Sequence, residues 1–180
     1  MASEGTHSMV DRMIGASSLN VHIFEEVEAD TSATKQAISV VILVALATGI
    51  ASLGTTGLGG LFVGVVVAIA GWAIWAWIVY LIGTKMLPTH ATQADWGQLA
   101  RTMGFAQSPG IFRVLGVVPV VGVIIFLVVS IWMLVAMVVA VRQALDYTST
   151  WRATGVVLIG VIPYVLLMSI AFALLELNGE

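Results

Sequence analysis

The carboxylates that precede the first long apolar run are the densest group of side chains capable of chemistry in this sequence. Four of them occur within six residues: Glu25, Glu26, Glu28 and Asp30. Carboxylates in pairs can serve as general acids and bases, and beside a histidine they can bind a metal ion. His22 is close enough in sequence to share a metal with Glu25 or Glu26. A charged helix at the surface is the interpretation that we favour.

The seven basic residues fall into three groups along the chain: Arg12 and Lys35, then Lys85, Arg101 and Arg113, and last Arg142 and Arg152. Arg142 and Asp146 are four residues apart, so they can pair if the helix continues there, which contributes about 0.2–0.5 kcal/mol. No nucleophile–base pair, His-Glu-x-x-His, Gly-x-Ser-x-Gly or phosphate-binding loop accompanies them. We therefore predict no catalytic residue, no metal site, no cofactor and no enzymatic activity.

The composition defines the surroundings in which these residues act. Of 180 residues, 59% are hydrophobic and only 9% are charged, against about 25% charged in soluble domains. The mean hydropathy is +1.05, which indicates a polytopic, all-α membrane helix bundle. The net charge of −3 argues against nucleic-acid binding. The sequence contains no cysteine, which excludes disulfides.

Three apolar segments have the length of a bilayer crossing, about 20 residues. We expect them at about Ala37–Leu53, Leu58–Ile82 and Ala153–Leu175, the last with a kink at Pro163. Small residues four apart in the first two segments (Ala45 and Gly49; Gly60, Gly64 and Ala68) predict a tight antiparallel hairpin. His7, His22 and His90 lie outside these spans, so haem ligation inside the membrane is not expected. Trp72 and Trp75 are expected to pack against a neighbouring helix or lipid.

The longest apolar run, Val114–Val141, either crosses once or turns back at Pro119. Cytoplasmic loops hold the excess of Lys and Arg. With a turn at Pro119, all seven basic residues face the cytoplasm; with a single crossing, two arginines lie outside. We therefore predict about five transmembrane helices, with the N-terminus cytoplasmic, the C-terminus outside and no ionisable residue firmly within a span.

The segment before the first span is expected to form one cytoplasmic or interfacial unit, residues 1–34, followed by the membrane domain, residues 35–180. Residues 1 to about 8 are expected to be a disordered tail. Apolar residues at near-helical spacing from Met9 to Asp30 predict one or two amphipathic helices on the membrane surface, with Asn20 as an N-cap. A solvated helix with an acidic face is the alternative. A further short helix is expected from Asp95 to about Phe105.

Many short matches, in order and spacing, resemble the Yip1-domain family in its bacterial form. They are Glu25–Asp30, Ala33-Thr34, Gln36-Ala37, Gly83–Lys85, Leu99–Ala106, Pro109, Pro119, Trp132 and Arg142–Ala153. The resemblance implies five membrane helices and a cytoplasmic N-terminus. Eukaryotic relatives act in vesicle traffic and bind small Rab-type GTPases. Because only about 35 residues precede the first expected span here, GTPase binding is not expected to carry over.

The function that these observations favour is that of a non-enzymatic accessory or scaffold protein in the bacterial inner membrane. It is expected to bind lipid and a membrane-protein partner or a second copy of itself. The partner-binding residues that we predict are the charged ones of the cytoplasmic face: Glu25, Glu26, Glu28, Asp30, Arg101, Arg142, Asp146 and Arg152. The alternative is a transporter or lipid-handling protein for an uncharged or lipidic solute. It predicts a cavity beside Pro119 and Pro163.

Overall fold

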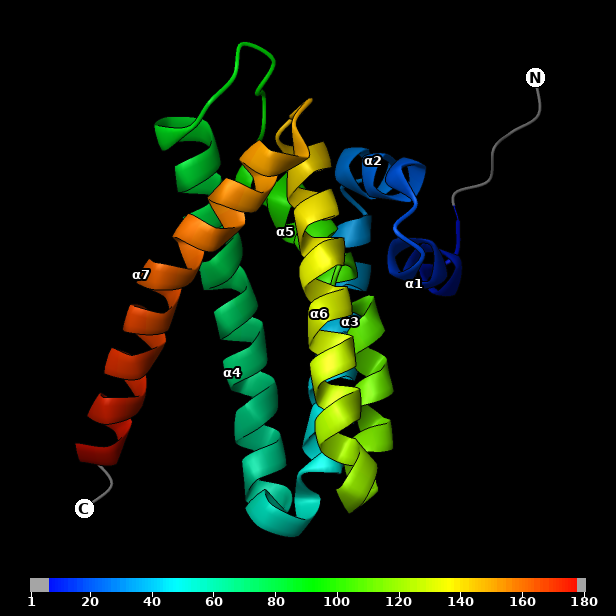
Figure 1. The fold of residues 1–180 in the computed structure, drawn as a ribbon, viewed down its shortest axis with the longest axis vertical. Helices are drawn as coiled ribbons and strands as arrows, with labels where there is room; N and C mark the ends of the chain where they lie inside the picture. Colours follow the sequence, from blue (N-terminus) through cyan, green and yellow to red (C-terminus); the bar gives the residue numbers. More distant parts are fainter. Residues whose placement is uncertain (1–6, 178–180) are drawn as a thin grey trace.

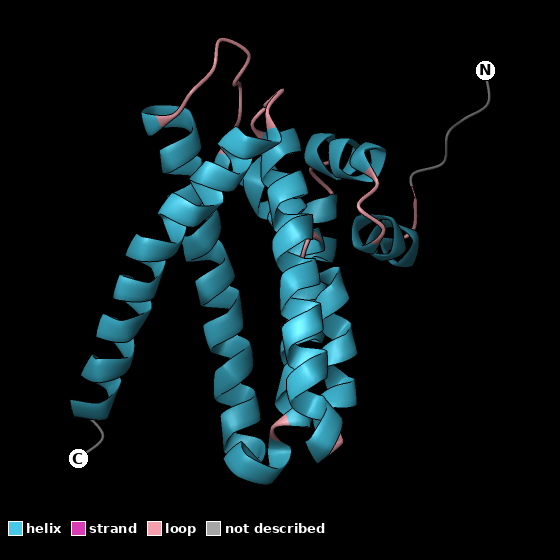
Figure 2. Ribbon diagram, in the orientation of Figure 1, coloured by secondary structure: helices cyan, strands magenta, loops and turns pink. Residues whose placement is uncertain are grey.

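The computed structural model describes residues 7–177, and within that range every regular element is a helix (Figure 2). This confirms the all-α class. The tail predicted for residues 1–8 lies outside the described residues as far as Thr6. Ser8 is already ordered, because its hydroxyl accepts a hydrogen bond from the Asp11 amide and caps the first helix.

Four helices are long and apolar enough to cross a membrane among the described residues. They are α3 (Ala33–Ala51), α4 (Leu53–Leu81, followed by a π-helical turn, η1, at Ile82–Met86), α6 (Pro119–Ala144) and α7 (Thr150–Leu177). They run along the long axis of the molecule, and α7 diverges from α4 toward its C-terminal end (Figure 1). Their outward apolar side chains, such as Ile162 and Phe62, are largely exposed, as expected of a surface that faces lipid.

Between α4 and α6 the chain returns along the bundle through two shorter helices. These are α5 (Trp96–Phe105) and the 3₁₀-helix η2 (Ser108–Val117). Along η2, Gly110 lies against Val44 and Gly116 lies against Ala51, so η2 runs beside α3 and antiparallel to α6. Val118 is extended, and Pro119 begins α6. The predicted turn at Pro119 is therefore confirmed.

The 3₁₀ conformation explains how so short a segment returns across the bundle. A 3₁₀-helix rises about 2.0 Å per residue, so the ten residues of η2 cover about 20 Å. The same residues in an α-helix cover only about 15 Å. Together with α5, η2 returns the chain along the bundle in two pieces rather than as one apolar helix, and the fifth membrane crossing stays a prediction.

The N-terminal segment forms two short helices, α1 (Met9–Ser17) and α2 (Val21–Ala29), at the end of the molecule where α7 begins (Figure 1). Asn20 caps α2, as predicted. Ile23, Phe24 and Val27 are buried where α2 packs against α5 and α6. The acidic helix is therefore docked on the protein itself rather than fully solvated. Its position relative to a membrane surface stays a prediction.

Helix α5 lies among four other helices at the end of the molecule where α7 begins (Figure 1). Every residue from Leu99 to Phe105 is buried, and α5 contacts α2, α3, α4 and α6. A Cβ on Gly104 would lie 2.8 Å from the Ala37 Cβ, so only glycine lets α5 approach α3 this closely. The segment Leu99–Phe105 is buried because these helices cover it, although its own composition looks half polar. Its place at the cytoplasmic face stays a prediction.

Helices α3 and α4 form the predicted hairpin, and Gly49 of α3 packs closely on α4, since a Cβ there would lie 3.2 Å from the Leu61 Cγ. Ala45, Gly49, Gly60 and Gly64 line a cavity of about 240 Å³ between the two helices. A Cβ on Gly64 would meet nothing within 4 Å. The hairpin is therefore confirmed, with close packing at Gly49 and open space at Gly64. The small side chains leave space that no other part of the described chain fills.

Candidate functional site

Arg101 joins α5 to the C-terminal end of α2. Its Nε donates to the Val27 carbonyl oxygen at 3.1 Å and its Nη2 donates to the Glu28 carbonyl oxygen at 2.5 Å. The last carbonyls of a helix have no partner within the helix. Because Arg101 is only 6% exposed, its charge is used to close α2 rather than to face solvent.

Trp132 closes the C-terminal end of α1 in the same way, by donating to a terminal carbonyl. Its indole Nε1 donates to the Ser17 carbonyl oxygen at 2.8 Å. The carbonyls of Ile14, Gly15 and Ala16 accept from the backbone amides that follow α1. All four terminal carbonyls of α1 are thus satisfied, the last of them by a side chain from α6.

The loop after α6 is closed in a similar way around Tyr147. Its hydroxyl donates to the Leu87 carbonyl oxygen at 2.7 Å, and Arg142 Nε donates to the Tyr147 carbonyl oxygen at 3.1 Å. Arg152 Nη1 donates to the Pro88 carbonyl oxygen at 3.0 Å. We call these contacts, with those of Arg101 and Trp132, the helix-end clasps.

The predicted Arg142–Asp146 pair does not form among the ion pairs of the described residues. The reason is that α6 ends at Ala144 and Asp146 adopts a left-handed backbone with φ 52°. The Asp146 and Tyr147 amides then donate to the carbonyls of Gln143 and Arg142, a Schellman closure of the helix. Asp146 is exposed there.

Arg12 forms ion pairs with two of the predicted acidic residues. Its fully buried guanidinium lies 2.8 Å from Glu26 Oε1 and 2.7 Å from Asp30 Oδ2, and it donates to Gln36 Oε1 at 2.9 Å. A hydrogen bond from Ser32 and those from Arg12 lower the pKa of Asp30 to about 2. One arginine therefore ties α1, α2 and the first turns of α3 together.

Glu28 is the exception among these carboxylates. Burial raises its pKa to about 7, assisted by the negative charges of Asp146, Glu25 and Asp95 and opposed by Arg101. Gln98 Nε2 donates to Glu28 Oε1 at 3.2 Å. The group therefore changes charge near neutral pH at the contact between α2 and α5.

The structure thus places Glu26 and Asp30 on Arg12, and Glu28 and Arg101 at the contact between α2 and α5. We call these two contacts of α2 the polar junction. Arg142, Asp146 and Arg152 lie around the loop after α6. Glu25 is exposed and accepts from Gln143 Nε2 at 3.1 Å. Contact of any of the eight with a partner stays a prediction.

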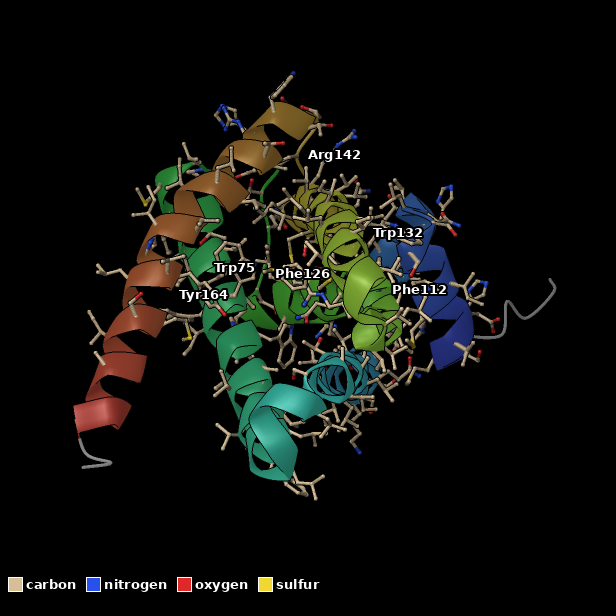
Figure 3. All side chains as sticks on the ribbon, turned by 60° about the horizontal axis from the view of Figure 1, so that its bottom comes forward. Trp75, Phe112, Phe126, Trp132, Arg142 and Tyr164 are labelled. Carbon is tan, nitrogen blue, oxygen red and sulfur yellow. The ribbon has the colours of Figure 1, made fainter. Side chains whose placement is uncertain are left out.

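An apolar groove of about 420 Å³ opens beside this junction, between α1, η2 and α6. Phe112 and Trp132 stack in its wall with ring centroids 5.7 Å apart and planes 12° apart. Both lie on the side of the bundle next to α1 (Figure 3). Val10 and Ile14 project from α1 at its edge, 60% and 61% exposed. Apolar side chains of this size are open to a partner or to lipid.

Arg113 bears on the prediction that no ionisable residue lies firmly within a span, because its side chain reaches the middle of α6. It is on η2, its Nη2 donates to Ser130 Oγ at 3.1 Å, and its guanidinium carbon lies 4.8 Å from the centroid of the Phe126 ring. Ser130 is near the middle of α6. The six other basic residues lie on α1, η1 and α5, in the first turns of α3 and α7, or in the last turn of α6. All of these segments are at the end of the bundle opposite the Pro119 turn (Figure 1). The 3₁₀ conformation of η2, which the sequence did not predict, places Arg113 beside the middle of α6.

Arg113 and Gln107 line the cavity between α3 and α4. A second cavity, of about 440 Å³, lies between α4 and α7 and is lined by Trp75, Val161 and Tyr164 among others. Trp75 and Tyr164 meet edge to face at 5.1 Å, and Figure 3 shows them between the two helices. Trp72 Nε1 donates to the Ala100 carbonyl oxygen. The prediction that Trp72 and Trp75 pack against neighbouring helices is therefore confirmed.

Sequence reasoning missed Arg12, Trp132 and Arg113 as organising residues. Each is an isolated residue with no motif around it, so its role depends on which helix lies opposite. Within residues 7–177, no three histidine, aspartate or glutamate side chains gather to form a possible metal site.

The four long apolar helices define an all-α, polytopic membrane protein. The family model for the Yip1 domain matches residues 21–171, from the start of α2 to the last turns of α7. The chain belongs to the Yip1-domain family. No curated protein and no solved structure matches the chain significantly.

Proposed function

We propose that this chain is a non-enzymatic accessory or scaffold protein that binds a partner membrane protein at the groove between α1, η2 and α6. The observation that carries this proposal is the open groove itself, edged by the exposed Val10 and Ile14. Aromatic and aliphatic side chains in a concave apolar surface are the usual anchors of protein contacts. The helix-end clasps and Arg12 give this surface a fixed shape.

Charged contacts come from those predicted residues that reach solvent. Glu25, Asp146 and Arg152 are exposed, whereas Arg101 and Arg12 are buried within the junction. We propose the three exposed residues as the polar part of the partner surface. The proposed location is the bacterial inner membrane, with α1 and α2 on the cytoplasmic side and the end of α7 on the outer side.

Photo-crosslinking tests the partner directly. A photoreactive amino acid replaces Ile14 in the groove or Lys35, which is exposed outside the groove. The protein is irradiated in native membranes and purified in a gentle detergent. We expect one stoichiometric protein adduct, or a dimer, from position 14 and none from position 35. Adducts with lipid alone, together with purification as a single free chain, would contradict the proposal.

The second candidate function is the handling of a lipidic or uncharged solute. The cavity between α4 and α7 favours it, because Val161, Tyr164 and Val165 line this cavity and flank Pro163. Photoreactive lipid analogues test this function: they are expected to label Trp75 in the cavity and not Trp151, which is exposed near the start of α7. Equal labelling of both tryptophans would contradict it.

A further inference from the structure

Arg113 is a cation held at mid-depth in the helix bundle. Its hydrogen-bond partner Ser130 is eleven residues from Pro119 and fourteen from Ala144 on α6. At 1.5 Å per residue, these separations are about 16 Å and 21 Å. The hydrocarbon core of a bilayer is about 30 Å thick. With α6 taken as a membrane span, the guanidinium therefore lies near the middle of the hydrocarbon core.

The protein neutralises this charge only in part. Among residues 7–177 no carboxylate forms an ion pair with Arg113. The guanidinium contacts the Ser130 hydroxyl through Nη2 and the Phe126 ring through its carbon atom. Its Nε is buried and has no hydrogen-bond acceptor among the described residues. An arginine does not lose its proton in proteins. A charge in an apolar interior requires an opposite charge beside it.

The space for an opposite charge is present on one side of Arg113. The cavity between α3 and α4 is polar where Arg113, Gln107 and Thr48 line it, and small residues form the rest of its wall. Gly64 leaves open space there, since a Cβ at this position would touch nothing within 4 Å. The volume of about 240 Å³ is sufficient for a small charged headgroup.

This cavity adjoins the larger one between α4 and α7. Ala68 and Gln107 line both. The larger cavity is apolar and aromatic, with Trp75, Val161 and Val165 in its wall. A charged pocket beside an apolar cavity matches the two parts of an amphiphile, an anionic head and a hydrocarbon tail.

We propose that Arg113 binds the anionic oxygens of an amphiphile, a phosphate diester or a carboxylate, while its hydrocarbon chain occupies the cavity between α4 and α7. The inference deepens the lipid-handling function proposed above and rests on it. It names the chemical class of the ligand and the residue that selects its charge.

Binding by the purified full-length protein tests the proposal. Native mass spectrometry follows titration with four probes: dioleoylphosphatidylglycerol, oleate, and their counterparts that carry no anionic group, dioleoylglycerol and oleyl alcohol. We expect one anionic amphiphile per chain, bound at least about tenfold more tightly than its counterpart. Preference for phosphatidylglycerol identifies the head as a phosphate diester, and preference for oleate identifies it as a carboxylate.

Two kinds of variant assign the binding to this site. Arg113→Gln is expected to weaken binding of the anionic probe about tenfold or more, and Arg113→Lys to restore part of it. Gly64→Leu, which fills the cavity without changing charge, is expected to weaken it as well. Lys35→Gln and Gly155→Leu are the matched controls, because Lys35 is exposed and Gly155 has open space outside both cavities.

The outcomes separate this inference from the function on which it rests. Equal binding of anionic and neutral probes, or unchanged binding by Arg113→Gln, overturns the role of Arg113 and leaves a lipid cavity. Absence of binding by all four probes overturns both. Neither result changes the crosslink expected at Ile14, which tests the scaffold function.

Discussion

Removal of the Arg101 guanidinium should release α2 from α5. In Arg101→Met the alkyl stem remains, but the carbonyls of Val27 and Glu28 lose the side-chain donors that Arg101 supplies. A hydrogen bond from a charged group contributes about 1.5–3 kcal/mol. Two such bonds give about 3–6 kcal/mol, reduced because the variant no longer buries a cation. We expect α2 docking to weaken by about 3 kcal/mol, a roughly 100-fold rise in its open population.

Cysteine labelling measures this opening cleanly, because the sequence contains no cysteine. Val27→Cys places a thiol on the buried face of α2, at a position that is 0% exposed. In detergent, its reaction with a maleimide should be roughly 100-fold faster when Arg101→Met is added. Lys35→Met, which removes an exposed charge, should leave the rate unchanged. Labelling that accelerates less than threefold would refute the assignment of Arg101 as a helix-end clasp.

Three further perturbations follow from the same contacts. Glu28 has a folded pKa of about 7, against an ordinary value of 4.5, so the stability it contributes is present below pH 4.5 and is lost as pH rises through 7. Glu28→Gln should remove this loss. The labelling rate of the Val27→Cys thiol is therefore measured with and without Glu28→Gln, and the ratio of the two rates should change between pH 5 and 8. A ratio that stays constant would contradict the raised pKa. Asp146→Gly should raise the unfolding temperature in detergent because it relieves the left-handed backbone, whereas Asp146→Val should lower stability by about 1–2 kcal/mol; equal effects would contradict the φ of 52°. Gly104→Val should cost about 1–3 kcal/mol by forcing α5 from Ala37, measured by the same thermal assay against Gly155→Val as the control.

Sequence reasoning located those features that depend on composition and on near neighbours. Long apolar runs defined α3, α4, α6 and α7, because a bilayer crossing requires nothing more specific. The cap at Asn20 and the helix start at Pro119 follow from local backbone chemistry. These predictions need no knowledge of which helix lies opposite.

The site depends on tertiary contacts, and there the sequence was less informative. Arg101 looks solvated in a half-polar segment, yet four helices bury α5. Arg113 looks like a residue at the end of a span, but a 3₁₀-helix places it beside Ser130. Asp146 adopts a backbone usually reserved for glycine. In each case, packing overrides the local preference.

The central claim is that α5 and η2 together return the chain across the membrane, so that it crosses five times. Single cysteines at His90 and Val118 test it, since both positions are exposed and lie on opposite sides of this segment. In intact cells, a membrane-impermeant maleimide should label Val118→Cys at once and label His90→Cys only after the membrane is opened. Labelling of both positions from the same side would contradict the five-crossing arrangement.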